Sequence, residues 1–230
     1  MRRRPAIIVF TREPLPGSSK SRLAARIGAR NAAALADAFT RDALAKVREL
    51  GLPLVIAASA TGAVQDSGYF QSLARRFDAA LVDQEQGNLG ARMARVLTPF
   101  ALSGALLIGT DTPSLPSSIL GRAATLIRHN HVVLGLCLDG GYYLVGIRGS
   151  VPDMFRGIRW GGPRVLQETI ARLARLGIRP ALTPAWYDVD RWGDLMVLAE
   201  QVRRFDERHA LPCPQTAKVL AQLGLLPTRR

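Results

Sequence analysis

Short apolar runs alternate with longer amphipathic segments along the whole chain. Uninterrupted apolar runs of this length are typical of buried strands, whereas apolar positions three or four residues apart are typical of helices. The pattern predicts strands at residues 5–10, 52–59, 79–84, 104–109, 131–137, 142–147 and 178–184. It predicts helices at residues 21–50, with a break near Gly28, and at 69–77, 89–101, 117–129, 163–176, 192–205 and 214–225.

The alternation of strands and helices predicts an α/β fold, in which helices cover both faces of one sheet. No internal repeat or low-complexity linker divides the chain, so residues 1–230 are expected to form a single domain. Ligands of such sheets bind beyond the carboxyl ends of the strands. The residues that follow each predicted strand are therefore the first candidates for a functional site.

The amino-terminal sequence MRRRPAIIVF is basic and then apolar, as a signal peptide is. Its apolar run covers only residues 6–10, which is too short for a signal-peptide core, and no other run approaches membrane-spanning length. The two cysteines, Cys137 and Cys213, form neither a disulfide framework nor a zinc motif, and Cys137 is expected to be a small buried residue of its strand. These features predict a cytoplasmic protein without a membrane span.

The formal net charge is +13, and arginine carries nearly all of the positive charge because only three lysines occur. The basic residues are scattered and are not interleaved with aromatic residues as a base-stacking surface requires. Nucleic-acid binding is therefore disfavoured as the main function. A general preference for arginine over lysine accounts for much of the charge, and a small polyanionic substrate such as a nucleotide suits it equally well.

A basic loop follows the first predicted strand, in the stretch FTREPLPGSSKSRL. Arg12 opens this loop, two prolines restrict it, and Gly17 lets the backbone approach a ligand. Lys20 and Arg22 then stand at the start of a helix, where a cation opposes the helix dipole unless an anion such as a polyphosphate is bound. The alternative is a solvated loop with exposed basic residues. A P-loop is excluded because the required glycine before the lysine is absent.

Acidic residues follow the central and late strands. Asp111 comes directly after the fourth strand, in IGTDTPSL, and Asp190 comes after the last, in WYDVDRWGDL. Carboxylate oxygens suit Mg²⁺ or Mn²⁺, which can bridge phosphates. Asp139 lies in LDGGYYLVG, where Asp-Gly also predicts a plain hairpin turn. Taken alone, Asp111 is more typical of an N-cap or turn residue, Asp190 could be a ligand or a cap, and Asp194 is expected to support the next helix.

The stretch FTREPLPGSSKSRLAARIG resembles the opening F-x-K-x-P-x-P-G-x-x-K-T-R-L of a bacterial family of glycosyltransferase-like proteins. Members of that family are often named for arsenosugar biosynthesis or for association with radical-SAM and seleno domains. Further family stretches are matched in order by QGNLGARM, IGTDTPSL, LDGGYYLVGI, FRGIRWGG and YDVDRWGDL. The resemblance covers about residues 5–200 and leaves residues 201–230 as a helical C-terminal extension.

The resemblance implies the nucleotide-diphospho-sugar transferase fold, called GT-A, a three-layer α/β/α sandwich around a mostly parallel mixed sheet. The chain is also similar to guanylyltransferases that make molybdenum cofactor or activate 2-phospholactate. In related nucleotidyltransferases, acids at the positions of Asp111 and Asp190 hold the metal, and Asp139 is carried over as an active-site loop residue. Arg12 replaces the family's usual lysine, and Arg191 replaces a threonine, which leaves the acceptor specificity open.

Three hypotheses of function follow. The first is a metal-dependent glycosyltransferase that uses a nucleotide sugar and a small-molecule acceptor. The second is a nucleotidyltransferase that uses an NTP and a phosphorylated acceptor and releases pyrophosphate, and the third is a nucleotide-binding regulator or nucleic-acid binder without enzyme activity. For the first, the expected catalytic residues are Asp139, Lys20 and Arg22; the nucleotide and phosphate contacts are Arg12, Gly17, Lys20, Arg22, Asn88 and Arg92; and the Mg²⁺ or Mn²⁺ ligands are Asp111 and Asp190.

Overall fold

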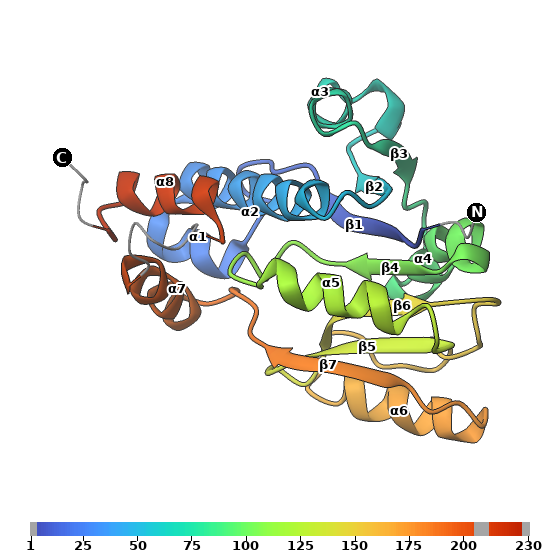
Figure 1. Cartoon of the computed structure of the whole chain (residues 1–230). Helices are drawn as coiled ribbons and strands as arrows, with labels where there is room; N and C mark the ends of the chain where they lie inside the picture. The colour runs from blue at the N-terminus through green and yellow to red at the C-terminus, as the bar shows by residue number, and fades with distance from the viewer. Residues whose placement is uncertain (1–3, 205–211, 227–230) are drawn as a thin grey trace.

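A single mixed sheet organises the chain in the computed structural model, which describes residues 4–204 and 212–226 (Figure 1). The strands lie in the order β3-β2-β1-β4-β6-β5-β7. Only β6 runs against its neighbours, so the other strands share one direction and the sheet is mostly parallel. The strands are β1 (Ala6–Arg12), β2 (Leu54–Ser59), β3 (Ala80–Asp83), β4 (Ala105–Ile108), β5 (Val132–Cys137), β6 (Tyr142–Ile147) and β7 (Ala181–Trp186).

Helices cover both faces of the sheet, which confirms the three-layer α/β/α sandwich of the GT-A fold. On one face, side chains such as Ile7 and Ile56 pack against α2, α3 and α5. On the other face, the alternate residues Ile8 and Val55 pack against α4 and α6. The helices of these layers are α2 (Ala29–Glu49), α3 (Gly68–Phe77), α4 (Leu89–Leu97), α5 (Ser117–Leu126) and α6 (Val165–Arg175).

A third apolar cluster lies at the end of the molecule where α1 (Ser21–Ile27), α7 (Trp192–Arg204) and α8 (Pro214–Gln222) gather beside α2 (Figure 1). Leu23, Phe39 and Leu195 are completely buried there. The cluster joins the start of the chain to its late helices. The expected helical extension therefore includes the end of α7 and all of α8, while residues 205–211 and 227–230 lie outside the described residues.

Most predicted elements are present, and the differences have local causes. The segment 89–101 is an α-helix only to Leu97 and continues as the 3₁₀-helix η2 (Thr98–Ser103), because Pro99 lacks the N–H that an α-helix would use. The last strand runs from Ala181 to Trp186 rather than over 178–184, and its Pro184 is tolerated because β7 is an edge strand. A short 3₁₀-helix, η1 (Val64–Asp66), was not predicted.

The sheet direction brings the predicted functional segments together. The segments after β1, β4, β5 and β7 all leave the carboxyl edge of the sheet, because these strands share one direction. Among the residues that the structure describes, no helix has the length and apolar character needed to cross a bilayer.

Candidate functional site

A cavity of about 1180 Å³ opens at the carboxyl edge of the sheet. It is lined by residues that follow β1, β4, β5 and β7, together with part of α4. Most of the predicted functional residues line it: Arg12, Lys20, Arg22, Arg92, Asp111, Asp139 and Asp190. The remaining two, Gly17 and Asn88, do not.

Lys20 lies at the centre of this arrangement. Its ammonium nitrogen Nζ is 2.8 Å from a carboxylate oxygen of Asp111 and 2.8 Å from a carboxylate oxygen of Asp190. It also donates a hydrogen bond of 2.7 Å to the carbonyl oxygen of Val189. The Lys20 side chain is only 8% exposed, and it passes over the ring of Phe39. The structure therefore brings the predicted phosphate-binding lysine into direct contact with both predicted metal ligands.

The charges around Lys20 stabilise one another. Burial acts to lower the pKa of Lys20, but the carboxylates of Asp111 and Asp190 outweigh it, so the net shift is upward. Burial likewise acts to raise the pKa of Asp190, but Lys20, and after it Arg22, outweigh burial and lower that pKa. Arg22 reaches Asp190 at 3.7 Å from its exposed position on α1. Lys20 is thus charged and Asp190 is ionised at neutral pH.

Hydrogen bonds fix the loop of Asp111 against the segment that carries Asp190. The carbonyl oxygen of Asp111 accepts a hydrogen bond of 2.8 Å from the N–H of Val189. The buried side chain of Lys46, on α2, donates to the carbonyl oxygen of Pro113 in the same loop. The Asp111 side chain itself is 50% exposed and faces the cavity. The loop is therefore fixed while its carboxylate remains accessible.

A second group of ligand atoms lies beside the first. Cys137, Asp139 and Asp188 each offer one atom, and these atoms lie within 4.8 Å of one another. Burial raises the pKa of the Cys137 thiol to about 12, so Cys137 is a protonated buried residue, as its strand position predicts. Burial, and then Asp139 and Asp190, raise the pKa of Asp188. Asp139 accepts a hydrogen bond of 2.8 Å from the N–H of Gly141, which is the turn role that Asp-Gly predicts.

The acids fit Mg²⁺ or Mn²⁺ by the chemistry of their oxygen atoms. Asp111 and Asp190 converge on one position, and the Lys20 ammonium occupies that position in the structure. A divalent cation that bridged both carboxylates would have to displace the ammonium. Cys137 makes the neighbouring group a poorer match, because a thiol is a soft ligand.

Arg92 lies at another part of the cavity wall. Its guanidinium carbon is 5.3 Å from the centre of the Phe10 ring, and it donates a hydrogen bond to the buried side chain of Gln84. Arg12, at the end of β1, lines the same cavity. Gln84 was not among the predicted functional residues. The signal in the sequence was a polar residue at the end of a predicted strand, which alone does not separate a buried residue from a solvated one.

Gly17 and Asn88 have local structural roles. Gly17 has φ of +86°, a conformation that favours glycine, within the turn in which Leu15 accepts the N–H of Ser18. Asn88 is the N-cap of α4, and its side chain accepts a hydrogen bond of 2.9 Å from the N–H of Ala91. The geometry accounts for both residues without a ligand, and their predicted contact with a nucleotide stays a prediction.

The aromatic wall of the cavity was also missed by the sequence analysis. Trp160 and Tyr142 line the cavity and meet edge to face, with ring centroids 6.4 Å apart. A side chain at Gly90 would collide with the Trp160 ring, and one at Gly140 would overlap the Pro163 carbonyl oxygen. Gly140 also accepts the N–H of Leu166 at 2.9 Å. These glycines allow the segment around Trp160 to close one side of the cavity.

Several solved protein structures have the same fold. A "putative nucleotide-diphospho-sugar transferase" from Desulfovibrio desulfuricans G20 matches with 28% identity and a TM-score of 0.82, over 96% of each chain. A cytidylyltransferase from Leptospira borgpetersenii matches with 12% identity and a TM-score of 0.56, over 99% of this chain and 98% of that one. The inositol-1-phosphate CTP transferase from T. maritima matches with 12% identity and a TM-score of 0.54, over 96% and 97%.

A comparison of the sequence with curated proteins finds no match. A family profile does match, over residues 39–162, and it spans more than half of the chain. Its match includes the segments of Gln84, Arg92, Asp111 and Asp139, and it ends at Gly162, just after Trp160. The chain therefore belongs to the DUF2064 family, described as an uncharacterized protein conserved in bacteria.

Proposed function

We propose that this protein is a metal-dependent transferase that uses a nucleotide-activated donor, with a nucleotide sugar as the donor and a small molecule as the acceptor. The observation that carries the proposal is the contact of Lys20 with Asp111 and Asp190 in one large cavity. The similarity in fold to the Desulfovibrio protein, along nearly the whole chain, supports the same class of reaction.

Each side chain has a role that its position allows. Lys20 and Arg22 neutralise the diphosphate and the charge that develops as the nucleoside diphosphate leaves. Asp111 and Asp190 would hold Mg²⁺ or Mn²⁺, which would further stabilise that charge. Asp139 is exposed and lines the cavity, and the N–H of Gly141 binds one of its oxygens, so its other oxygen can orient the acceptor or take its proton.

Nucleotidyl transfer is the second candidate. The cavity carries Arg12 and Arg92 in addition to Lys20 and Arg22, and a triphosphate requires more cations than a diphosphate. In this reaction the acceptor attacks the α-phosphate of an NTP and pyrophosphate leaves. Nucleotidyl transfer would be detected as release of pyrophosphate from GTP or CTP in the presence of a phosphorylated acceptor.

A thermal-shift screen separates the two candidates. The ligands are nucleoside di- and triphosphates and UDP-, GDP-, ADP-, CMP- and dTDP-sugars, each with and without Mn²⁺. Because a ligand of the native state raises its apparent stability, a Mn²⁺-dependent shift with one nucleotide sugar is the expected result. A shift with an NTP alone would support nucleotidyl transfer instead.

The variant Asp111→Asn tests the site itself. It keeps the shape of the side chain and removes the charge that a divalent cation needs, so the Mn²⁺-dependent part of the shift should disappear. Asp153→Asn is the matched control, because Asp153 is an exposed partner of Arg172 and does not line the cavity. An unchanged Mn²⁺-dependent shift in Asp111→Asn would show that Asp111 is not a metal ligand.

A further inference from the structure

The charged side chains of the cavity are unevenly paired. Lys20 and Arg22 lie against Asp190, so much of their charge is already balanced by the protein. Among the described residues, neither Arg12 nor Arg92 makes an ion pair with a carboxylate. Arg191 also makes none, but its backbone N–H is bound by Asp194 in the acidic part of the cavity. Three arginines of the cavity wall, Arg12, Arg92 and Arg191, thus have no ion pair among the described residues, and the charge of Arg12 acts on Arg92.

Gln84 holds Arg92 in place. Its side chain is buried, and its amide nitrogen donates two hydrogen bonds of 2.7 Å, to the carbonyl oxygens of Thr11 and Ala57. Two carbonyl partners fix which end of the amide is the nitrogen, so the amide oxygen is aimed at Arg92, whose Nη2 donates to it. A buried polar side chain with every partner satisfied has a defined orientation. Gln84 is thus a rigid support between β1, β2 and α4.

Arg92 retains donors that no residue of the described chain uses. Its Nε is buried without a hydrogen-bond partner, while its guanidinium lies over the Phe10 ring and lines the cavity. Burial, and next the nearby charge of Arg12, lower the pKa of Arg92, while Asp83 acts in the opposite direction. Arg92 is partly buried and Arg12 is exposed at the end of β1, and an anion bound between the two guanidinium groups would relieve their repulsion. The planar array of arginine donors matches the oxygens of a phosphoryl group.

We infer that Arg12 and Arg92 form a second anion subsite of this cavity, which binds a phosphoryl group, and that Gln84 is its positioning residue. The inference rests on the proposed function for the identity of the substrates, and the phosphoryl group belongs either to the nucleotide donor or to a phosphorylated acceptor. The cavity of about 1180 Å³ has room for the donor and the acceptor together, since pockets for one ligand usually measure about 300–1000 Å³. The subsite works without a metal ion, because its charges come from arginine.

Inorganic pyrophosphate in the presence of EDTA is the probe, and its dissociation constant is measured by titration calorimetry. The variants Arg12→Met, Arg92→Met and Gln84→Met should each weaken binding about tenfold or more, the effect of losing one charge-assisted hydrogen bond. Arg95→Met is the matched control, because Arg95 lies one turn further along α4 and pairs with Glu85 outside the cavity. It should bind within about twofold of the wild type. If Arg12→Met and Arg92→Met both bind like the control, the inference is wrong.

Gln84→Glu distinguishes positioning from a purely structural role. When the carboxyl introduced at this position is protonated, Arg92 keeps its full charge, whereas an ionised carboxylate there neutralises it. The dissociation constant of this variant relative to the wild type should therefore rise with pH. A ratio that is constant with pH in a folded Gln84→Glu protein would contradict the positioning role. Arg92 is only partly buried, so Arg92→Met should fold. This variant therefore tests the subsite even if the Gln84 variants fail to fold.

Nucleotides and a sugar phosphate identify the source of the phosphoryl group. If Arg92→Met weakens binding of UDP or CTP but not of glucose 1-phosphate, the subsite holds the donor. The reverse result assigns it to the acceptor, and no effect on any phosphate ligand overturns it. All of these measurements are made without metal, so they can succeed even if the Mn²⁺-dependent screen for a nucleotide sugar fails.

Discussion

At the scale of single residues, Lys20 has all three of its ammonium donors satisfied by oxygen atoms. These belong to Asp111, Asp190 and Val189, at 2.7 to 2.8 Å. Its backbone is left-handed, with φ of 47° and ψ of 49°, which costs a residue with a side chain about 1–2 kcal/mol. The surroundings must hold Lys20 there, since the conformation is not intrinsically favourable. In this state the ammonium contacts both carboxylates that would hold a divalent cation.

The variant Lys20→Met should therefore bind Mn²⁺ more tightly than the wild type when no nucleotide is present. Removal of the competing ammonium leaves the carboxylates of Asp111 and Asp190 without a shared cation. We expect at least about a tenfold gain in affinity, or ~1.4 kcal/mol, which is close to the lower value of one charge-assisted hydrogen bond. Titration of free Mn²⁺ by electron paramagnetic resonance measures it.

Arg26→Met is the control for the loss of one positive charge, because Arg26 lies in the last turn of α1. It should leave the Mn²⁺ affinity within about twofold of the wild type. Equal or weaker Mn²⁺ binding by Lys20→Met would mean that the ammonium and the metal do not compete for the same carboxylates.

The sequence could predict that Lys20, Asp111 and Asp190 share a cleft, because each follows a strand of a mostly parallel sheet. It could not predict that they touch. Lys20 is 169 and 170 positions from the residues that accept its hydrogen bonds near β7, and no local pattern encodes a contact over that distance. The same limit applies to Gln84, whose two carbonyl partners come from separate strands.

At the scale of elements, the junction of α2 and α8 contains a buried polar cluster. Asp42 on α2 accepts hydrogen bonds from the N–H groups of Gln215 and Thr216 and from the Thr216 hydroxyl, at 2.6 to 2.9 Å. Asp42 thereby accepts hydrogen bonds from free N–H groups in the first turn of α8, which is the role that an N-cap side chain usually has. Lys46, one turn along α2, is buried beside Asp42 and Cys213. Its bond to Pro113 links this junction to the loop of Asp111.

This junction should make stability depend on pH. Burial lowers the pKa of Lys46 to about 8, although Cys213, Asp42 and Glu49 act to raise it. The unfolded chain, in which the pKa of lysine is about 10.4, binds more protons above pH 8, so the free energy of unfolding should rise with pH through this range. Cys213 acts in the opposite direction above about pH 9, because burial raises its pKa to about 12.

The test compares the wild type with Lys46→Met in urea at pH 7, 8 and 9. The wild type should gain about 1 kcal/mol relative to the variant between pH 7 and pH 9, as the depressed pKa of Lys46 requires. Titrating groups that do not interact with Lys46 cancel in the difference, since both proteins carry them. Parallel stability curves for the two proteins would mean that Lys46 keeps an ordinary pKa in the fold.

The elements that could be predicted are those whose signal is local. Apolar runs and helical periodicity located every strand of the sheet. The break near Gly28 was also expected, and Gly28 has a φ of 82°, which glycine adopts without strain. The end of α4 and the position of β7 depend on Pro99 and on the edge of the sheet. The docking of α8 depends on Asp42, which in the sequence is an ordinary polar residue of a long helix.

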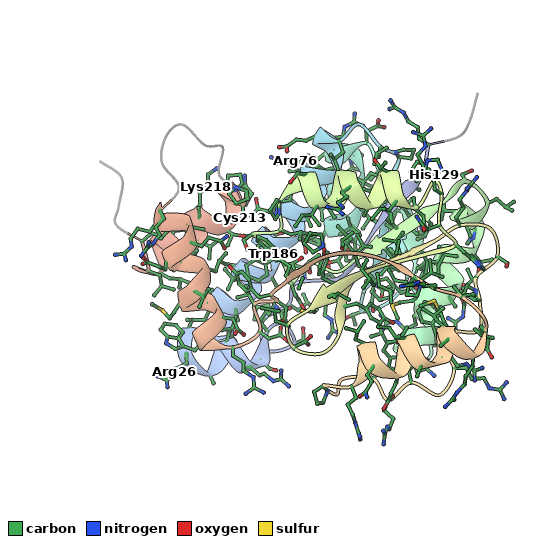
Figure 2. The ribbon with its side chains drawn as sticks, turned by 60° about the horizontal axis from the view of Figure 1, so that its bottom comes forward. Arg26, Arg76, His129, Trp186, Cys213 and Lys218 are labelled. Carbon is green, nitrogen blue, oxygen red and sulfur yellow. The ribbon has the colours of Figure 1, made fainter. Side chains whose placement is uncertain are left out.

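At the scale of the whole molecule, the cavity and the rest of the surface differ in charge. Five acidic and five basic side chains line the cavity, so the formal net charge of +13 comes from elsewhere in the chain. Figure 2 shows Arg26 and Arg76 on well-separated parts of the molecule, on α1 and α3. A small anion in the cavity and a polyanion on the outside would therefore meet different residues.

Duplex DNA should bind this protein only through such outer charges. Binding that depends on many scattered phosphate contacts falls about 10³-fold or more between 50 and 200 mM salt. We expect fluorescence anisotropy of a labelled duplex to show that loss, and Arg92→Met and Lys20→Met should leave the remaining affinity unchanged, because both residues lie in the cavity wall. Duplex binding that persists at 200 mM salt, or that is lost in Arg92→Met, would instead place nucleic acid in the cavity and make it the substrate. Because the charge of the cavity is balanced by its own acids, a long polyanion gains little there, whereas a single phosphoryl group can reach Arg12 and Arg92, which have no carboxylate partner among the described residues.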